Sequence, residues 1–165
     1  MRNLWTPWRY QYIRSQKSNG CVFCDALSSA DEEQALVLHR GRLNFVLLNR
    51  YPYSNGHLMI APNEHISTPV ETGNDTINDM AVLMKEAVQV LNEAYNPDGF
   101  NIGMNIGTAA GAGIKDHFHL HVVPRWHGDT NYMTSIGNTR LIPQTLEEIW
   151  KELKYLFDKL HKNDK

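Results

Sequence analysis

Three histidines occur at every second position in one short segment of the sequence. They alternate with apolar residues in the order His117, Phe118, His119, Leu120, His121, Val122, Val123. A β-strand sends successive side chains to opposite faces, so this alternation predicts a strand with all three imidazoles on one face and the apolar side chains in the core. Such a row can bind a metal ion through three imidazoles, or it can position one imidazole as a nucleophile.

A run of small residues precedes this segment. Residues 107–113 read Gly-Thr-Ala-Ala-Gly-Ala-Gly, and small residues let backbone N–H groups approach an oxyanion closely. The run is not a Walker A loop, because no Gly-Lys-Ser/Thr ends it, and Asp116 stands where a dinucleotide-binding motif needs its third glycine. Next to three histidines on one strand face, we interpret the run as a phosphate-binding loop.

The two cysteines of the chain, Cys21 and Cys24, form one Cys-x-x-Cys pair. In a reducing compartment such a pair is more often a metal or redox site than a structural disulfide. A thioredoxin-like motif lies between a strand and a helix, whereas this pair follows the turn-forming residues 18–20. The position favours a metal site, provided that two more ligands lie nearby.

The elements that position these residues follow from hydrophobic patterning. Residues 43–48 and 57–61 are rich in strand-forming residues and flank a turn, which predicts an antiparallel pair. Residues 68–71 predict a one-turn helix, and apolar residues at spacings of three and four predict a core helix from Asp75 to about Ala94. Residues 100–105 predict another strand.

The two ends of the chain have different patterns. Residues 144–161 contain a capping box and an apolar stripe at helical spacing, which predicts a C-terminal amphipathic helix. Residues 1–20 form an aromatic and basic arm that either packs over the core or a partner subunit, or stacks on a base. The strands and few helices, joined by short turns, predict an α+β fold with an antiparallel sheet. The length fits a single domain over residues 1–165.

Composition excludes several classes of function. With 18 acidic and 16 basic residues the formal charge is -2, which gives no global field for nucleic acid or anionic lipid. No stretch approaches the ~20 apolar residues that span a bilayer, and Arg2, Pro7 and Arg9 interrupt the run that a signal peptide needs. We therefore expect a cytoplasmic protein that binds a small anionic ligand through a local cluster, without a nucleic-acid or membrane partner.

The histidine segment resembles the signature of the histidine triad (HIT) superfamily of nucleotide hydrolases and transferases. The resemblance extends upstream through residues 48–57, which end at an additional histidine, and downstream through residues 123–129. Residues 4–9 and the loop at 111–114 look most like the branch that contains diadenosine tetraphosphate phosphorylases and hydrolases. The resemblance covers about residues 1–145 and implies a HIT-like fold and a homodimer.

The resemblance also implies catalytic roles. His119 would attack the α-phosphorus of a nucleotide, such as a dinucleoside polyphosphate, and form a covalent nucleotidyl-imidazole. Neutral imidazole is a competent nucleophile near pH 7. His121 would donate to the phosphoryl oxygens, His57 would complete the cluster by hydrogen bonding, and His117 would orient the nucleophile or bind metal.

Nucleotide contacts are implied at other positions. Asn49 is similar to the family residue that holds the ribose hydroxyls, and Asn105 to one near the phosphate, where Gly111 and Gly113 would also lie. Many family members carry a Gln-Ser or Gln-Thr pair just before the triad, where this chain has Gly113-Ile114. Either inorganic phosphate or water can therefore release the nucleotide.

The cysteine pair has a counterpart in the superfamily. Several members hold a structural zinc with two cysteines, a histidine after the second strand and the first triad histidine. The matching residues here are Cys21, Cys24, His65 and His117. Two thiolates and two imidazoles form a closed tetrahedral set, so this zinc would be structural, and the proposed chemistry requires no catalytic metal.

Two other functions stay open from the sequence. One is a metal-dependent hydrolase with its metal on the three triad histidines, which leaves Asn49, His57 and the cysteine pair without a role. The other is a nucleotide-binding module without turnover, suggested by the missing loop glutamine. Loss of activity on chelation would indicate the first, and binding of AMP without cleavage would indicate the second.

Overall fold

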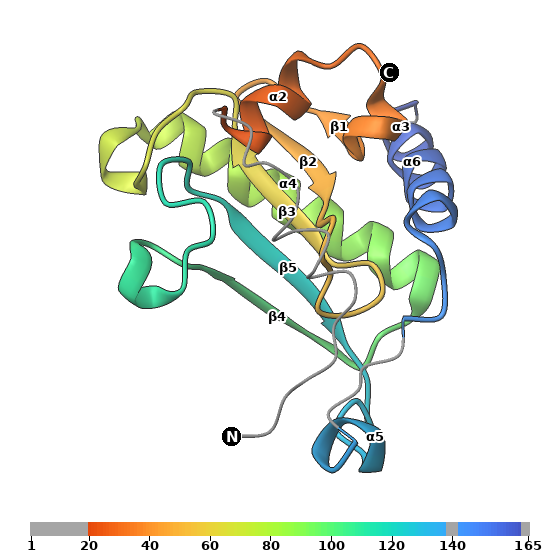
Figure 1. The fold of residues 1–165 in the computed structure, drawn as a ribbon. Coiled ribbons are helices and arrows are strands. Elements are labelled where there is room, and N and C mark those ends of the chain that lie inside the picture. The colour runs from red at the N-terminus through yellow and green to blue at the C-terminus, as the bar shows by residue number, and fades with distance from the viewer. Residues whose placement is uncertain (1–19, 138–141, 163–165) are drawn as a thin grey trace.

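The computed structural model of the chain describes residues 20–137 and 142–162. Five strands form one antiparallel sheet in the order β1-β2-β3-β5-β4 (Figure 1). The strands are β1 (Val37–Arg40), β2 (Asn44–Leu48), β3 (Leu58–Pro62), β4 (Gly99–Met104) and β5 (Leu120–Arg125). The helices are α2 (Val22–Ser28), α3 (Glu32–Ala35), α4 (Asn74–Tyr95), α5 (Tyr132–Ser135) and α6 (Leu146–Lys162), with short 3-10 turns η1 (Pro69–Glu71) and η2 (Thr108–Ala110). This arrangement confirms the predicted α+β fold with one long core helix and a C-terminal helix.

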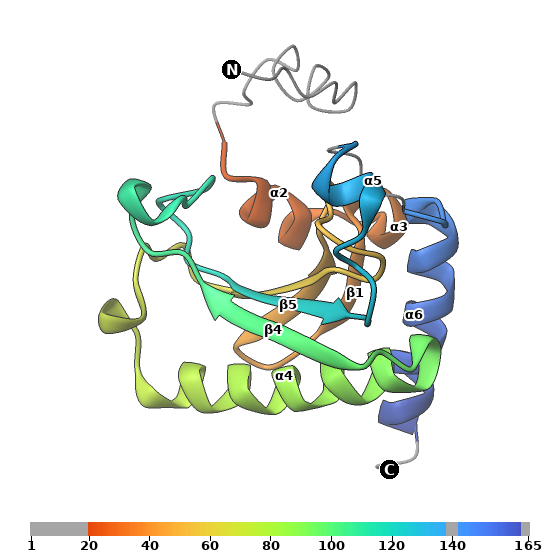
Figure 2. The same ribbon diagram turned by 90° about the horizontal axis from the view of Figure 1, so that it is seen from below.

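Helices pack on both faces of the sheet and divide its side chains between two clusters. α4 covers one face, together with α6, and α2 lies over the other (Figure 2). Because side chains alternate along a strand, Ile60 of β3 packs under α4, whereas Met59 and Ala61 pack under α2. We call these sides the α4 face and the α2 face. The α2 face is centred on Phe23, which is fully buried.

The predicted central elements are confirmed. β2 and β3 pair antiparallel, with Phe45 opposite Ala61. The predicted one-turn helix is η1, which begins after the cap Thr68. The predicted core helix is α4, and the strand predicted at 100–105 is β4. The buried residues of α4 are Met80, Leu83, Ala87, Val90 and Leu91.

The predicted C-terminal helix is confirmed as α6. Its capping box is formed, because the Glu148 N–H donates to Thr145 Oγ1 and the Glu148 carboxylate accepts from the Thr145 N–H at 2.8 Å. Leu153 and Phe157 are fully buried on the α4 face. The indole N–H of Trp150 donates to the first carbonyl of β1 over 2.9 Å, which fixes α6 against the edge of the sheet. The predicted N-terminal arm lies outside the described residues, apart from Gly20.

The histidine segment is a regular strand only from Leu120 onwards, three residues later than the alternation predicts. The carbonyl of His117 accepts from the ring of His119, and the N–H of Phe118 donates to the carbonyl of Ile66. The carbonyl of His117 and the N–H of Phe118 therefore have partners other than the backbone of β3. The short elements β1, α2, α3 and α5 have no counterpart among the predicted ones, because four to seven residues carry little periodicity. In the described ranges no helix is long and apolar enough to cross a membrane.

Candidate functional site

The triad histidines lie on the α2 face of the sheet. Phe118 is buried in the α4-face cluster, so the alternating side chains of His117, His119 and His121 point the other way. His117 and His119 are buried, and His57, directly before β3, is only 1% exposed. Pairing of β3 with β5 brings His57 to His121. The fold therefore gathers the four histidines that the resemblance implies for catalysis.

A backbone carbonyl fixes the tautomer of His119. Its Nδ1 lies 3.0 Å from the carbonyl oxygen of His117. Because a carbonyl only accepts, Nδ1 carries the proton in the neutral ring and Nε2 carries the lone pair. Burial lowers the pKa of His119 below its ordinary value, so the ring is neutral near pH 7. A neutral, oriented imidazole is what nucleophilic attack requires.

A chain of hydrogen bonds fixes the tautomers of His57 and His121. The N–H of Tyr53 donates to His57 Nδ1 over 3.1 Å, and Nδ2 of Asn49 lies 3.4 Å from the same atom. His57 must then carry its proton on Nε2, which donates to Nδ1 of His121 over 3.0 Å. His121 therefore carries its own proton on Nε2. That N–H is available to a bound anion.

The cluster of His57, His119 and His121 is electrically neutral near pH 7. Burial, together with the neighbouring imidazoles, lowers the pKa of His57 to about 3 and that of His121 to about 4. Burial disfavours the charged form of each ring, and a proton on one ring would disfavour a proton on the next. An anionic ligand would therefore be held by N–H dipoles rather than by ion pairs with these rings.

Two aromatic side chains outside the predicted set contact the cluster. The ring of Phe23 packs against the rings of His117 and His119, with centroids 5.1 and 4.7 Å away. The ring of Tyr53 lies 4.7 Å from that of His57 and stays 51% exposed. No spacing in the sequence marks either residue for the site, because both contacts depend on how α2 and the turn before β3 fold over the sheet.

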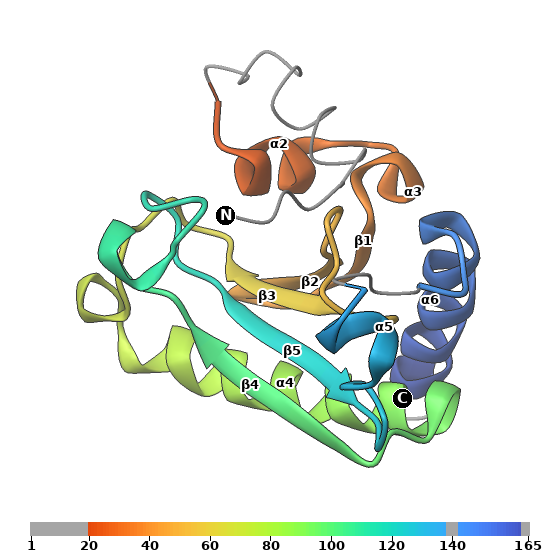
Figure 3. The same cartoon turned by 60° about the horizontal axis from the view of Figure 1, so that its bottom comes forward.

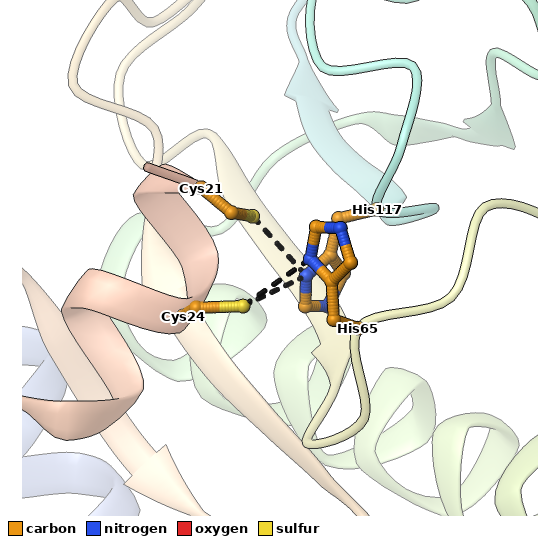
Figure 4. A group of neighbouring side chains, drawn as sticks. All are labelled: Cys21, Cys24, His65 and His117. Atoms are coloured by element: carbon orange, nitrogen blue, oxygen red, sulfur yellow. Dashed lines mark hydrogen bonds between the residues drawn. The ribbon is translucent and has the colours of Figure 1, made fainter. Parts of the chain in front are cut away.

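A separate cluster of sulfur and nitrogen ligands forms where α2 begins (Figure 4). Cys21 Sγ lies 3.3 Å from His117 Nδ1, and Cys24 Sγ lies 3.7 Å from the same atom. Cys24 Sγ also lies 3.3 Å from Nδ1 of His65. The other ring nitrogen of His117, Nε2, donates to the carbonyl of Pro62 over 2.9 Å. The lone pair on His117 Nδ1 therefore faces the sulfur atoms.

These distances fit a tetrahedral metal ion. With Zn–S at about 2.3 Å and Zn–N at about 2.1 Å, ligand atoms at tetrahedral angles lie about 3.6 Å apart. Observed separations between sulfur and nitrogen are 3.3 to 3.7 Å. Burial and the neighbouring Cys21 raise the pKa of the Cys24 thiol, so two adjacent thiolates need a cation beside them. The cluster of Cys21, Cys24, His65 and His117 can therefore hold a metal ion.

The residues expected to contact a nucleotide differ in how closely they approach the histidines. Asn49 follows β2 directly and contacts His57. Asn105 is half-buried directly after β4, and among the described residues it makes no hydrogen bond to the histidines. The N–H of Gly111 donates to the carbonyl of Thr108 over 3.0 Å, so it is used within the loop. Gly113 is exposed, and no atom lies within 4 Å of the point where a side chain would begin. Its backbone is therefore open to a ligand.

The triad imidazoles do not converge on one point. His117 turns Nδ1 toward the cysteines, and Nδ1 of His121 accepts from His57. Over residues 20–137 and 142–162, no group of ligand atoms within 4.8 Å of one another is made of the three triad histidines. This geometry favours a nucleophilic imidazole over a metal ion bound by the triad.

Comparison with known proteins adds to this geometry. The HIT domain family matches residues 30–128 of the chain. An AP-4-A phosphorylase from Mycobacterium tuberculosis is 37% identical over 90% of this chain and 80% of its own length. The crystal structure of a zinc-bound histidine triad family protein from Mycobacterium smegmatis superposes with a TM-score of 0.69 and 28% identity, over 87% of this chain and 97% of its own. A hypothetical histidine triad nucleotide-binding protein from Sulfolobus tokodaii has a TM-score of 0.67 and 25% identity, over 85% of this chain and 93% of its own.

Proposed function

The chain belongs to the HIT domain family, whose members are nucleotide hydrolases and transferases, and we propose that it cleaves dinucleoside polyphosphates of the diadenosine tetraphosphate type at the α-phosphate. The observation that carries the proposal is the orientation of two adjacent rings. His119 presents a lone pair and His121 presents an N–H, with ring centroids 4.8 Å apart. Similarity to the AP-4-A phosphorylase supports the choice of substrate.

In the first step, Nε2 of His119 attacks the α-phosphorus. An N–P bond forms while the P–O bond to the leaving group breaks, which gives an adenylyl-imidazole and ATP from diadenosine tetraphosphate. The Nδ1–H of His119 remains bonded to the His117 carbonyl, whose dipole stabilises the positive charge that develops on the ring. No general base is required, because the ring is neutral before the attack.

The remaining residues bind and orient the substrate. The Nε2–H of His121 donates to an α-phosphoryl oxygen, and the chain from the Tyr53 N–H through His57 keeps that proton in place. Asn49 would hold the ribose hydroxyls. Asn105 and the backbone N–H of Gly113 would lie at the phosphates.

In the second step, an oxygen nucleophile attacks the same phosphorus. The N–P bond breaks, its electron pair returns to Nε2, and His119 is neutral again. Inorganic phosphate as the acceptor gives ADP, whereas water gives AMP, and the proton of the attacking oxygen passes to the solvent. The similarity to a relative named a phosphorylase favours phosphate.

We also propose that Cys21, Cys24, His65 and His117 bind a structural zinc ion. The closed donor set and the sulfur–nitrogen distances support this proposal, as does the zinc-bound relative. Bound zinc would cross-link α2 to the start of the triad segment. Elemental analysis of the purified chain is expected to find zinc, and Cys24→Ser should remove it while exposed Ser28→Ala should not.

We propose further that the chain is a single-domain cytoplasmic protein that assembles as a homodimer. β4 is an edge strand with exposed central residues, which suits pairing with a second copy. Light scattering on the purified chain measures the assembly, and a monomeric mass at micromolar concentration would contradict the homodimer.

Product analysis tests the reaction. The chain should be incubated with diadenosine tetraphosphate, with and without inorganic phosphate. ATP plus ADP, formed only when phosphate is present, indicates phosphorolysis, and ATP plus AMP without phosphate indicates hydrolysis. Binding of AMP with no cleavage across a panel of dinucleoside polyphosphates would instead support the binding module.

Trapping tests the intermediate. Intact-mass measurement after an acid-free quench should show a chain heavier by one adenylyl group, and His119→Asn should lack both the adduct and turnover. If His119→Asn stays active, or if activity disappears with chelation and returns with metal while the chain stays folded, the covalent mechanism is wrong.

A further inference from the structure

A second group of metal-ligating side chains lies at the edge of the α4 face. One ring nitrogen each of His39 and His161 and one carboxylate oxygen of Glu86 lie within 4.8 Å of one another. The three residues come from β1, α4 and the last turn of α6, and α6 packs against both β1 and α4 (Figure 3). We propose that this group, which we call the α6 cluster, binds a divalent transition-metal ion and thereby ties the end of α6 to the sheet.

An irregularity in β1 directs His39 to this place. Leu36 and Leu38 belong to the α4-face cluster and Val37 to the α2 face, so strict alternation would turn His39 toward α2. The β1–β2 register shifts between Val37 and His39, and a β-bulge of this kind places consecutive side chains on one side. The ring of His39 accordingly lies over α6, with its centroid 6.0 Å from that of Phe157.

The core stripe of α6 continues into His161. Leu153 and Phe157 are fully buried, and His161 is the next residue at the four-residue spacing. Its side chain is 31% exposed, and that of Glu86 is 19% exposed. Nε2 of His161 lies 3.2 Å from Oε2 of Glu86. A polar group thus occupies the position where the apolar contact between the two helices ends.

The donor set selects the class of ion. Two imidazoles and one carboxylate suit zinc, nickel, cobalt or copper, whereas calcium and magnesium prefer oxygen ligands throughout. The one carboxylate offsets part of the ion's charge. Lys154, whose charge acts on His39, is already paired with Glu32 and Asp158, at 3.2 and 3.0 Å.

Binding requires one local rearrangement. The rings of His39 and His161 are stacked, with centroids 3.9 Å apart and planes 6° apart. A metal ion lies in the plane of each imidazole that ligates it, so two parallel rings cannot both bind without a turn of one side chain. His161 is the penultimate residue of α6 and its side chain is partly exposed, so its ring is the one that can turn. Three protein ligands leave at least one position for water.

Metal stoichiometry tests the proposal independently of the catalytic proposal. The full chain is first loaded with one equivalent of zinc, which should fill the proposed site of Cys21, Cys24, His65 and His117, and is then dialysed against excess zinc. Elemental analysis should find a second bound ion per chain. In the wild type, the ring-proton NMR signals of His39 and His161 should shift with the second equivalent only, and calcium should cause no such shift.

Matched variants locate the second ion. Glu86→Gln keeps the shape of the side chain and should lose the second ion while retaining the first. Glu93→Gln is the control, because Glu93 joins the same two helices through an ion pair with Lys159 at 2.7 Å and lies outside the α6 cluster. His161→Asn, at the helix end, replaces Glu86→Gln if that variant fails to fold. The proposal is overturned if the preloaded wild type binds no second ion, or if Glu86→Gln and His161→Asn bind it as the wild type does.

Discussion

His117 and His119 are two residues apart and both buried, and both pack against Phe23, yet they present opposite ring nitrogens. The carbonyl of Pro62 takes the Nε2 proton of His117, which leaves Nδ1 for the cysteine cluster. The carbonyl of His117 takes the Nδ1 proton of His119, which leaves Nε2 for a substrate. A backbone acceptor at each ring therefore separates the proposed metal ligand from the proposed nucleophile, although the residue type is the same.

The largest expected effect comes from replacing each of these histidines in turn. His119→Asn should lower the turnover of diadenosine tetraphosphate by at least about 10³-fold, because the lone pair of His117 faces the cysteines and that of His121 accepts from His57. The same variant should keep its zinc. His117→Asn should lose zinc, and it should lose activity only as far as the segment unfolds. Steady-state kinetics and elemental analysis on the two variants measure both effects.

The exposed histidine His127 supplies the control for this pair. His127→Asn should change neither turnover nor zinc content. If His119→Asn lost zinc as completely as His117→Asn does, the two rings would share one role. The proposed division, with His117 as metal ligand and His119 as nucleophile, would then be wrong.

A second prediction concerns the residue that contacts both rings. Phe23→Ala should lower the free energy of unfolding by about 3–5 kcal/mol, because it empties the centre of the α2 face. Zinc affinity and turnover should both fall, since both rings lose the surface that holds them. Urea denaturation, zinc competition and kinetics on one preparation measure the three effects. Phe23→Leu, which fills most of the volume, should recover most of the stability, the zinc affinity and the turnover. If only zinc affinity or only turnover fell in Phe23→Ala, Phe23 would support only His117 or only His119.

The sequence predicts which histidines gather on one face of the sheet, but it does not predict the contacts that orient their rings. Alternation in the triad segment correctly placed Phe118 and Leu120 in the core, and with them the histidines on the opposite face. The carbonyl that orients His117 belongs to Pro62, and neither this pairing nor the packing of Phe23 leaves a local signal. Such contacts join segments that are distant in the chain, so periodicity cannot reveal them.

The metal ligands were proposed from resemblance, whereas the α6 cluster was not anticipated. Neither His39 nor His161 belongs to a sequence motif, so the sequence pattern does not mark them as ligands. The β-bulge at β1 turns His39 toward α6, and bulges leave little trace in a hydrophobic pattern. The direction of His39 thus depends on a backbone irregularity, whereas His161 follows the regular spacing of α6.

A third prediction lowers the pH to test whether the buried rings of His57 and His121 are neutral in the folded chain. The pKa values of His57 and His121 in the folded chain, about 3 and about 4, lie below the ordinary value of 6.5. Between these values the unfolded chain binds more protons than the folded chain, so the free energy of unfolding falls as the pH falls. From pH 7 to about pH 5.5, each ring should contribute a loss of about 1 kcal/mol. Urea denaturation across this range measures the slope, and His57→Gln should reduce it; a slope unchanged in His57→Gln would mean that other groups cause it.

The smallest expected effect concerns the contacts that hold the turn before His57 in place, outside the cysteine cluster. Gln144, just before α6, accepts from Nδ2 of Asn55 over 2.7 Å and donates to the Glu152 carboxylate over 3.2 Å. Glu152 also accepts from Tyr95 over 3.1 Å, so the turn that leads to His57 is fastened to α6 and α4.

Gln144→Ala should lower the free energy of unfolding by about 1–2 kcal/mol, because it removes two hydrogen bonds and leaves Asn55 without its partner. Turnover should fall a few-fold through displacement of His57, while zinc content stays unchanged. The control is Gln89→Ala, on the exposed side of α4. A loss of zinc in Gln144→Ala would show that the turn and the cysteine cluster move together. Unchanged kinetics in a destabilised variant would show that the position of His57 is set by its bonds to Tyr53 and His121 alone.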